Sequence, residues 1–153
     1  MSLKTIAIGC DHGGFRLKEK IIAFLEKKRF RVKDFGAFSE ESVDYPDTAY
    51  EVAALVSKKK ISRGILICKS GIGNSMVANK LNNVRAALCY NVRAAELSRR
   101  HNDANVLVLG ALFVNTSQAK KIVGVWLKTP FEGGRHLRRI QKIERIEQLC
   151  HRP

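Results

Sequence analysis

Residues 64–81 read GILICKSGIGNSMVANKL, and the order of residue types in this stretch is typical of an α/β protein. An apolar, β-branched run ends at Cys68, a short loop with two glycines follows, and helix formers come directly after the loop. A buried strand that passes through a glycine loop into a helix is the first half of a βαβ unit. The stretch therefore predicts a parallel sheet, with this loop at the carboxyl end of one strand.

The same alternation of apolar runs and helical stripes continues along the chain. Strands are predicted at 5–10, 31–36, 64–68, 84–90 and 105–110, and helices at 14–30, from Pro46 onward, at 74–80, 92–101 and 117–128. Such alternation indicates parallel strands joined by right-handed crossovers. A last helix carries an apolar residue at every third position from Leu137 to Leu149, and it can pack on its own domain or on a partner subunit. We expect one domain over 1–153.

Composition and charge narrow the class of protein. Hydrophobic residues make up 45% and charged residues 27%, as in soluble globular proteins. No apolar stretch approaches the roughly 20 residues that span a bilayer, and the start MSLKTIAIGCDH lacks the pattern of a secretory signal. We therefore expect a cytoplasmic protein whose cysteines are reduced. The net charge of +14 suits polyanions or phosphorylated small molecules, but its bases are spread as on solvated helix faces.

The loop after Cys68 is a candidate anion site. Gly71 and Gly73 permit positive φ, so successive N–H groups can form a nest whose field favours an anion and the Cys68 thiolate. The alternative is a plain glycine turn beside a buried cysteine. Known anion loops do not match, because Met76 stands where a dinucleotide fingerprint needs glycine and Asn74 where a cysteine phosphatase needs arginine.

Other polar clusters border the predicted strands. Asp11 and His12 follow the first strand, where they can transfer protons or contact a sugar phosphate, or where Asp11 simply caps a helix. RRHND, with His101 and Asn102, precedes the strand at 105–110 and is also a plausible turn. We expect these clusters to converge with the Cys68 loop at the carboxyl edge of the sheet.

Two arginines complete the candidate chemistry. Arg135 and Arg139 lie four residues apart, on one face of the last helix, and can form a phosphate fork or remain solvated. A base, an acid, an anion nest and paired arginines, without a metal cluster or a cofactor motif, favour proton transfer on a phosphorylated carbonyl compound.

Five motifs occur together in one order: GCDHGGF, DYP, ILICKSGIG followed by ANK, LSRRHNDANVL and FEGGRHLRR. With these motifs the chain resembles the sugar-phosphate isomerase family, which includes ribose-5-phosphate isomerase B and galactose-6-phosphate isomerase subunits. The resemblance implies a Rossmann-like three-layer α/β/α sandwich with a central parallel sheet and an extra C-terminal helix. It also implies a homodimer or dimer of dimers with shared active sites. Neither a metal nor a cofactor is implied. The implied reaction interconverts ribose 5-phosphate and ribulose 5-phosphate through a cis-enediolate.

The resemblance also implies roles for individual residues. Cys68 matches the base that moves a proton between C2 and C1, Ser70 matches a hydroxyl beside these carbons, and His101 and Asp11 match residues that assist ring opening. The matching substrate-binding residues are the amides of Gly71, Ile72, Gly73 and Asn74 for the enediolate, His12, Arg135 and Arg139 for the phosphate, and Tyr45 and Asn102 as further contacts.

Two positions depart from the family pattern. Lys69 stands where the family usually has glycine, and Leu112 stands where many members have an arginine that reaches the phosphate from the neighbouring subunit. A six-carbon substrate, allose or galactose 6-phosphate, therefore stays open, as does a non-catalytic polyanion-binding role. The partner we expect is a phosphorylated sugar, with neither nucleic acid nor membrane.

Overall fold

A central sheet of five parallel strands organises the protein, whose computed structural model describes residues 4–150. The strands are β1 (Thr5–Cys10), β2 (Arg31–Asp34), β3 (Gly64–Cys68), β4 (Ala86–Leu88) and β5 (Val106–Gly110), in the order β2-β1-β3-β5-β4. Every neighbouring pair is parallel, as the sequence predicted. The ends of the predicted 1–153 domain, residues 1–3 and 151–153, lie outside the described residues.

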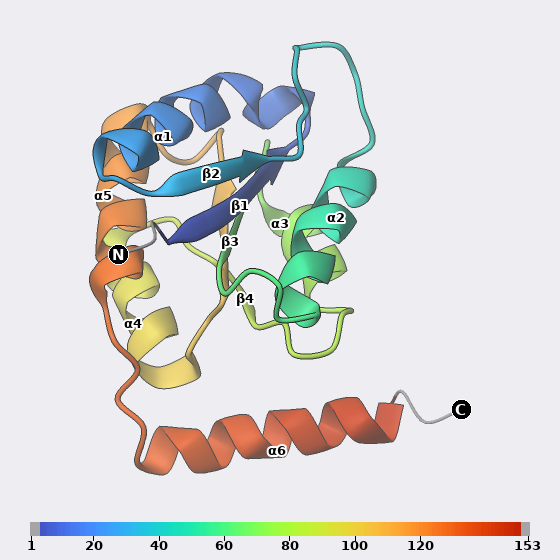
Figure 1. The fold of residues 1–153 in the computed structure, drawn as a ribbon, viewed down its shortest axis with the longest axis vertical. Coiled ribbons are helices and arrows are strands. Elements are labelled where there is room, and N and C mark those ends of the chain that lie inside the picture. The colour runs from blue at the N-terminus through green and yellow to red at the C-terminus, as the bar shows by residue number, and fades with distance from the viewer. Residues whose placement is uncertain (1–3, 151–153) are drawn as a thin grey trace.

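Helices cover both faces of the sheet (Figure 1). They are α1 (Phe15–Lys27), α2 (Tyr45–Ser57), α3 (Ile72–Ala78), α4 (Val92–Asn102), α5 (Thr116–Lys128) and α6 (Arg135–Cys150), and the short 3-10 helix η1 (His12–Gly14) precedes α1. Helices α1, α4 and α5 lie on one face, and α2 and α3 lie on the other. The predicted three-layer sandwich with an extra C-terminal helix is confirmed. The strands expected at 31–36 and 84–90 are shorter than predicted.

The core forms because the middle strands are apolar on both sides. In β3, Ile65 and Ile67 face α1 and α5, whereas Leu66 faces α2, and all three are fully buried. Strands covered on both faces read as continuous apolar runs, which explains why GILIC is apolar throughout.

The strand order reverses between β1 and β3, which lie side by side although they are not consecutive in the sequence. Ligands of open parallel sheets bind at the carboxyl ends of the strands, at such a switch point. The N–H of Asp11, directly after β1, donates to the carbonyl of Ile67 at 3.2 Å, and this bond places Asp11 beside the end of β3. The fold therefore brings Asp11 and Cys68 to the switch point.

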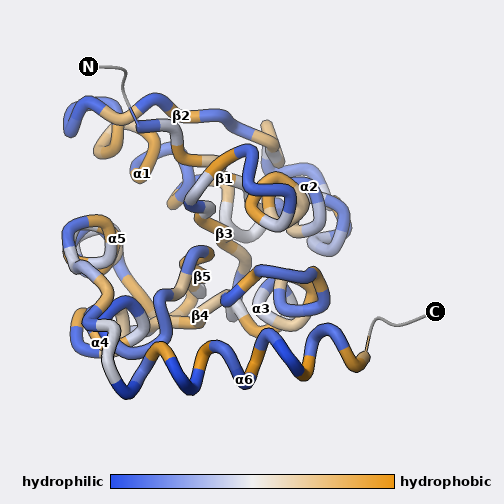
Figure 2. The backbone as a smooth tube through the Cα atoms, turned by 60° about the horizontal axis from the view of Figure 1, so that its bottom comes forward, coloured by the Kyte–Doolittle hydropathy of each residue, from blue (hydrophilic) through white to orange (hydrophobic). Residues whose placement is uncertain are grey.

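Helix α6 runs along the edge of the molecule and is only partly packed (Figure 1). Ile140 is 4% exposed, whereas Leu137, Ile143, Ile146 and Leu149 are 42–65% exposed. Figure 2 shows the resulting alternation of hydrophilic and hydrophobic residues along α6. Ile140 is thus the one apolar residue of α6 that is buried against its own domain, and most of the apolar stripe is partly open. Within residues 4–150, no helix combines the length and apolar character needed to cross a membrane.

Candidate active site

Cys68 ends β3 and is only 4% exposed. Its Sγ accepts a hydrogen bond from the Gly71 N–H at 3.1 Å. Gly71 has φ of +82°, the left-handed conformation that the sequence predicted for it. Gly73 was expected to share this conformation but is helical within α3. Its missing Cβ instead makes room for the Tyr45 ring, whose nearest atom would lie 2.5 Å from a Cβ at that position.

The environment of the Cys68 thiol combines opposing effects. Burial raises its pKa, the N–H groups of Gly71, Asn74 and Ser70 lower it, and the charge of Asp11 raises it again. Burial outweighs the amides, so the pKa of Cys68 lies above the usual thiol value. The expectation that the loop favours the thiolate is therefore wrong for a single chain, because desolvation dominates the field of the loop.

The polar groups of this loop differ in whether they have hydrogen-bond partners. The N–H of Ile72 donates to the Ser70 hydroxyl at 3.2 Å. Gly73 and Asn74 lie in the first turn of α3, where N–H groups have no helical acceptor. The Asn74 side chain is 1% exposed, and its Oδ1 accepts no hydrogen bond from any residue in 4–150. A buried acceptor without a donor costs about 1–3 kcal/mol, so this loop gains stability from a ligand that donates to it.

Asp11 and His12 lie beside the Cys68 loop. The Asp11 carboxylate accepts from the Gly14 N–H at 3.0 Å, so the capping alternative is correct, and Asp11 still adjoins Cys68 closely enough to raise its pKa. His12 Nδ1 accepts from the Val43 N–H at 3.2 Å, which ties η1 to the loop before α2. We call this group the Cys68 cluster; its members are Asp11, His12, Tyr45, Cys68, Ser70 and Gly71 to Asn74.

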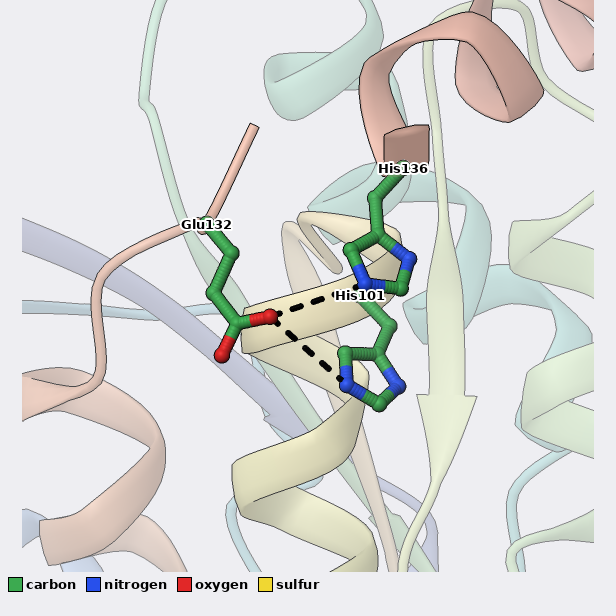
Figure 3. A group of neighbouring side chains, drawn as sticks. All are labelled: His101, Glu132 and His136. Atoms are coloured by element: carbon green, nitrogen blue, oxygen red, sulfur yellow. Dashed lines mark ion pairs between the residues drawn. The ribbon is translucent and has the colours of Figure 1, made fainter. Parts of the chain in front are cut away.

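A second cluster joins the end of α4 to the start of α6 (Figure 3). The rings of His101 and His136 stack with centroids 4.2 Å apart and planes 9° apart. One carboxylate oxygen of Glu132, Oε2, lies 3.8 Å from Nε2 of His101 and 3.5 Å from Nε2 of His136. Nε of Arg100 donates to the other carboxylate oxygen, Oε1. The backbone carbonyl of Arg100 accepts from the Glu132 N–H at 3.1 Å. We call these four residues, with Asn102, Arg135 and Arg139, the His101 cluster.

The surroundings shift the pKa of two groups in the His101 cluster. Burial lowers the pKa of His136, and the charges of His101 and Arg135 lower it further. The Arg100 guanidinium lowers the pKa of Glu132, so its carboxylate is ionised. Sequence analysis missed both Glu132 and His136, although both lie in FEGGRHLRR. The four-residue spacing between Glu132 and His136 could have indicated a site, but the prediction considered only Arg135 and Arg139.

The two clusters do not meet within one chain, and this corrects the expectation that RRHND converges with the other loops. Helix α4 runs back from the end of β4, so His101 and Asn102 lie near the amino end of β5. The Asn102 carbonyl accepts from Nε of Arg85, which precedes β4. Since β5 has five residues, its two ends are about 15 Å apart. Cys68 and His101 therefore lie at opposite edges of the sheet.

The two departures from the family pattern both lie at the Cys68 edge. Lys69 is not in a left-handed conformation, so the backbone does not require glycine there, and its side chain covers Gly13. The N–H of Leu112 donates to the Lys69 carbonyl at 3.0 Å, and the Leu112 side chain is 71% exposed. A longer side chain at position 112 would thus project from the same edge as the Cys68 loop.

Two sizeable cavities lie elsewhere. One of about 500 Å³ is lined by Arg63, Arg85 and Arg99 near the amino ends of the strands, and one of about 590 Å³ lies beneath Ile143 and Ile146 of α6. Neither of these two includes Cys68. Neither cavity therefore adjoins the Cys68 thiol.

Known proteins match this arrangement over nearly the whole chain. The profile of the Ribose/Galactose Isomerase family matches residues 6–143. The chain belongs to this family. Ribose-5-phosphate isomerase B of Escherichia coli strain K12 is 47% identical over 146 residues, which are 95% of this chain and 98% of that protein.

Two solved structures of ribose/galactose isomerase relatives are also similar. The ribose-5-phosphate isomerase B of Clostridium thermocellum has a TM-score of 0.94 and 49% identity, covering 95% of this chain and 99% of that one. The enzyme of Mycoplasma genitalium with bound ribulose 5-phosphate has a TM-score of 0.91 and 47% identity, covering 97% and 98%. The fold predicted from the family resemblance is therefore correct.

Proposed function

We infer that the chain is an aldose–ketose isomerase that interconverts ribose 5-phosphate and ribulose 5-phosphate. The observation that carries this inference is the full-length similarity to ribose-5-phosphate isomerases B, one of them solved with ribulose 5-phosphate bound. The geometry is compatible, because the Cys68 cluster combines a thiol, a carboxylate and backbone donors at the switch point of the sheet.

In the proposed mechanism, the Cys68 thiolate takes the proton from C2 of the open-chain aldose. The electron pair moves onto the carbonyl oxygen O1, and the cis-enediolate forms. The proton of the O2 hydroxyl passes to O1, and the Cys68 thiol returns the carbon-bound proton to C1, which leaves the carbonyl at C2. The amides at the start of α3 bind the negative oxygens, and each such donor is worth roughly 3 kcal/mol. The unpartnered Asn74 Oδ1 accepts from a substrate hydroxyl, which removes the cost of its burial.

The raised pKa of Cys68 has two consequences for this role. A smaller fraction of the thiol is ionised at neutral pH, but each thiolate is a stronger base for a carbon-bound proton. Ser70, whose hydroxyl accepts from the Ile72 N–H, lies beside the reacting carbons in this proposal. Asp11 and His101 assist opening of the furanose ring, and His12 contacts the phosphate together with Arg135 and Arg139.

We also propose that two copies of the chain share each active site. The support is the separation of the clusters, since His101 and Cys68 of one chain lie at opposite edges of its sheet. In a two-fold interface, a contact between the Cys68 cluster of one copy and the His101 cluster of the other occurs twice, so both sites are completed at once. Exposed apolar side chains are available for such an interface; on the described chain they include Ile72, Met76, Leu112, Phe113, Ile143 and Ile146.

A cytoplasmic location is part of the proposal. Its support is the four cysteines, Cys10, Cys68, Cys89 and Cys150, which form no disulfide within residues 4–150. Free thiols are the ordinary state of cysteine in reducing compartments.

The test is isomerisation by the purified protein in EDTA, with ribose 5-phosphate, allose 6-phosphate and galactose 6-phosphate compared at equal concentration. We expect ribose 5-phosphate to have the highest kcat/KM. A higher value for a six-carbon sugar would contradict the pentose assignment. No conversion of any sugar, together with salt-sensitive RNA retention on filters, would contradict the isomerase assignment in favour of polyanion binding.

A further inference from the structure

His101, Glu132 and His136 offer two imidazole nitrogens and one carboxylate oxygen, all within 4.8 Å of one another. Two histidines and one glutamate are a donor set with which proteins hold Zn²⁺ while leaving a coordination position open. The three residues come from the end of α4, the loop before α6 and the first turn of α6, so the fold brings them together from three segments.

The geometry is close to that of a bound ion. Both Nε2 atoms face the same oxygen of Glu132, at 3.8 and 3.5 Å (Figure 3). Ligands of tetrahedral Zn²⁺ bind at about 2.0–2.1 Å and therefore lie about 3.3 Å apart. The two N···O spacings exceed this by about 0.5 and 0.2 Å. Because the two rings stack nearly parallel, the His101 ring must also turn before both nitrogens point at one ion. The side chains of His101 and Glu132 are 35% and 37% exposed, so both can rotate to close the difference.

The surrounding charges determine how tightly the three side chains would bind a cation. Arg100 occupies Oε1 of Glu132, while Oε2 faces the two rings. The positive charges of Arg100, Arg135 and Arg139 oppose a cation. We therefore expect reversible binding and not a permanent structural ion.

We propose that His101, Glu132 and His136 bind a divalent transition-metal ion of the zinc type, and that this ion reversibly inhibits the enzyme by occupying Nε2 of His101. The binding clause stands on the geometry of the three side chains alone. The inhibitory clause rests on the proposed function, which assigns His101 to ring opening.

Binding is tested with Co²⁺, whose spectrum reports its ligands. The protein is stripped with EDTA and carries Cys68→Ser and Cys150→Ser, so that neither the thiol of the candidate active site nor the exposed thiol competes. We expect one Co²⁺ per chain, visible absorption without the near-ultraviolet band of cobalt–thiolate bonds, and displacement by Zn²⁺. Glu132→Gln and His101→Gln weaken binding at least tenfold, whereas Glu26→Gln, which changes an exposed carboxylate of α1 outside both clusters, leaves it intact.

Two results would overturn the binding clause: no saturable Co²⁺ uptake, or uptake that Glu132→Gln and His101→Gln leave unchanged. Both variants change partly exposed side chains, so the test does not depend on replacing the buried His136.

Inhibition is tested on the protein with its native cysteines. Added Zn²⁺ should lower ribose 5-phosphate isomerisation in step with occupancy of the site, EDTA should restore it, and Glu132→Gln should need at least tenfold more Zn²⁺. Full activity at saturating Zn²⁺ would overturn the inhibitory clause. Failure of the proposed function looks different, because isomerisation would then be absent in EDTA whatever the Co²⁺ spectrum shows.

Discussion

The two clusters of candidate site residues are built in different ways. The Cys68 cluster consists of a buried thiol, loop amides and a capped carboxylate at the carboxyl edge of the sheet. The His101 cluster consists mainly of partly exposed ionic side chains around the buried His136, held by α4 and α6 near the opposite edge. A buried, preorganised loop suits charge that develops during reaction, whereas exposed arginines suit a permanent charge such as phosphate. We therefore propose that the Cys68 cluster carries the proton transfer between C2 and C1, and that the His101 cluster binds most of the phosphate charge and supplies His101 for ring opening.

The strongest test of this division of roles is to mutate each cluster and to measure kcat and KM separately. Cys68→Ala should lower kcat by about 10³-fold with little change in KM, because a general base contributes roughly 10²–10⁴-fold. Arg139→Ala should instead raise KM by about tenfold or more, since a hydrogen bond to a charged group is worth about 1.5–3 kcal/mol. Cys150→Ala and Arg138→Ala are the matched controls. A Cys68→Ala protein with unreduced kcat would contradict the division.

The stability of the Cys68 edge depends on Lys18, which is fully buried and bonds Asp34 at 2.6 Å and the Ala37 carbonyl at 2.8 Å. Lys18→Met leaves a partly buried carboxylate unpaired, so we expect the free energy of unfolding to fall by about 3 kcal/mol. Urea denaturation measures the change.

The control for this prediction is Lys20→Met, which removes an exposed lysine from the same helix. Equal effects of the two substitutions would show that the Lys18–Asp34 pair does not support the loop that His12 contacts.

The pH dependence of kcat/KM should report the ionisation of Cys68. Because burial raises the pKa of Cys68, the thiolate fraction is small at neutral pH and rises as pH increases towards that pKa. We expect kcat/KM to increase about tenfold per pH unit between about pH 6 and 8, without a plateau. The pH dependence of Cys68 alkylation by iodoacetamide should follow the same curve. A plateau already near neutral pH would show that the assembled enzyme lowers this pKa below its usual range.

A smaller effect is expected from Leu112→Arg. The exposed side chain at this position projects from the Cys68 edge, and an arginine there adds a phosphate donor to the other cluster's arginines. KM for ribose 5-phosphate should fall several-fold, up to about tenfold. Leu112→Gln, which adds no charge, is the control. An unchanged KM would show that position 112 does not reach the phosphate.

The fold could be predicted from sequence because its signals are local. GILIC and VLVLG are continuous apolar strands, and Gly71 adopts the left-handed turn expected of it. The site was only partly predictable. Proximity in sequence to strand β5 suggested that His101 joins Cys68, but the direction of α4 places it at the other end of that strand. The spacing of Glu132 and His136 was visible in the sequence, but their meeting with His101 depends on tertiary packing.

The pKa of Cys68 shows a second limit. The glycine loop correctly predicts N–H donors to the sulfur, but the sequence does not show how deeply the sulfur is buried. Burial is a property of the whole sheet and its covering helices, and it determines the direction of the shift.

The most direct test of shared active sites is complementation between Cys68→Ala and His101→Gln proteins, each nearly inactive alone. When the two are co-expressed or co-refolded, half of the dimers are mixed, and each mixed dimer contains one intact site. We predict recovery of about a quarter of the wild-type activity, as two-fold symmetry requires. Activity that stays at the sum of the two separate variants would contradict an active site built from Cys68 of one chain and His101 of another.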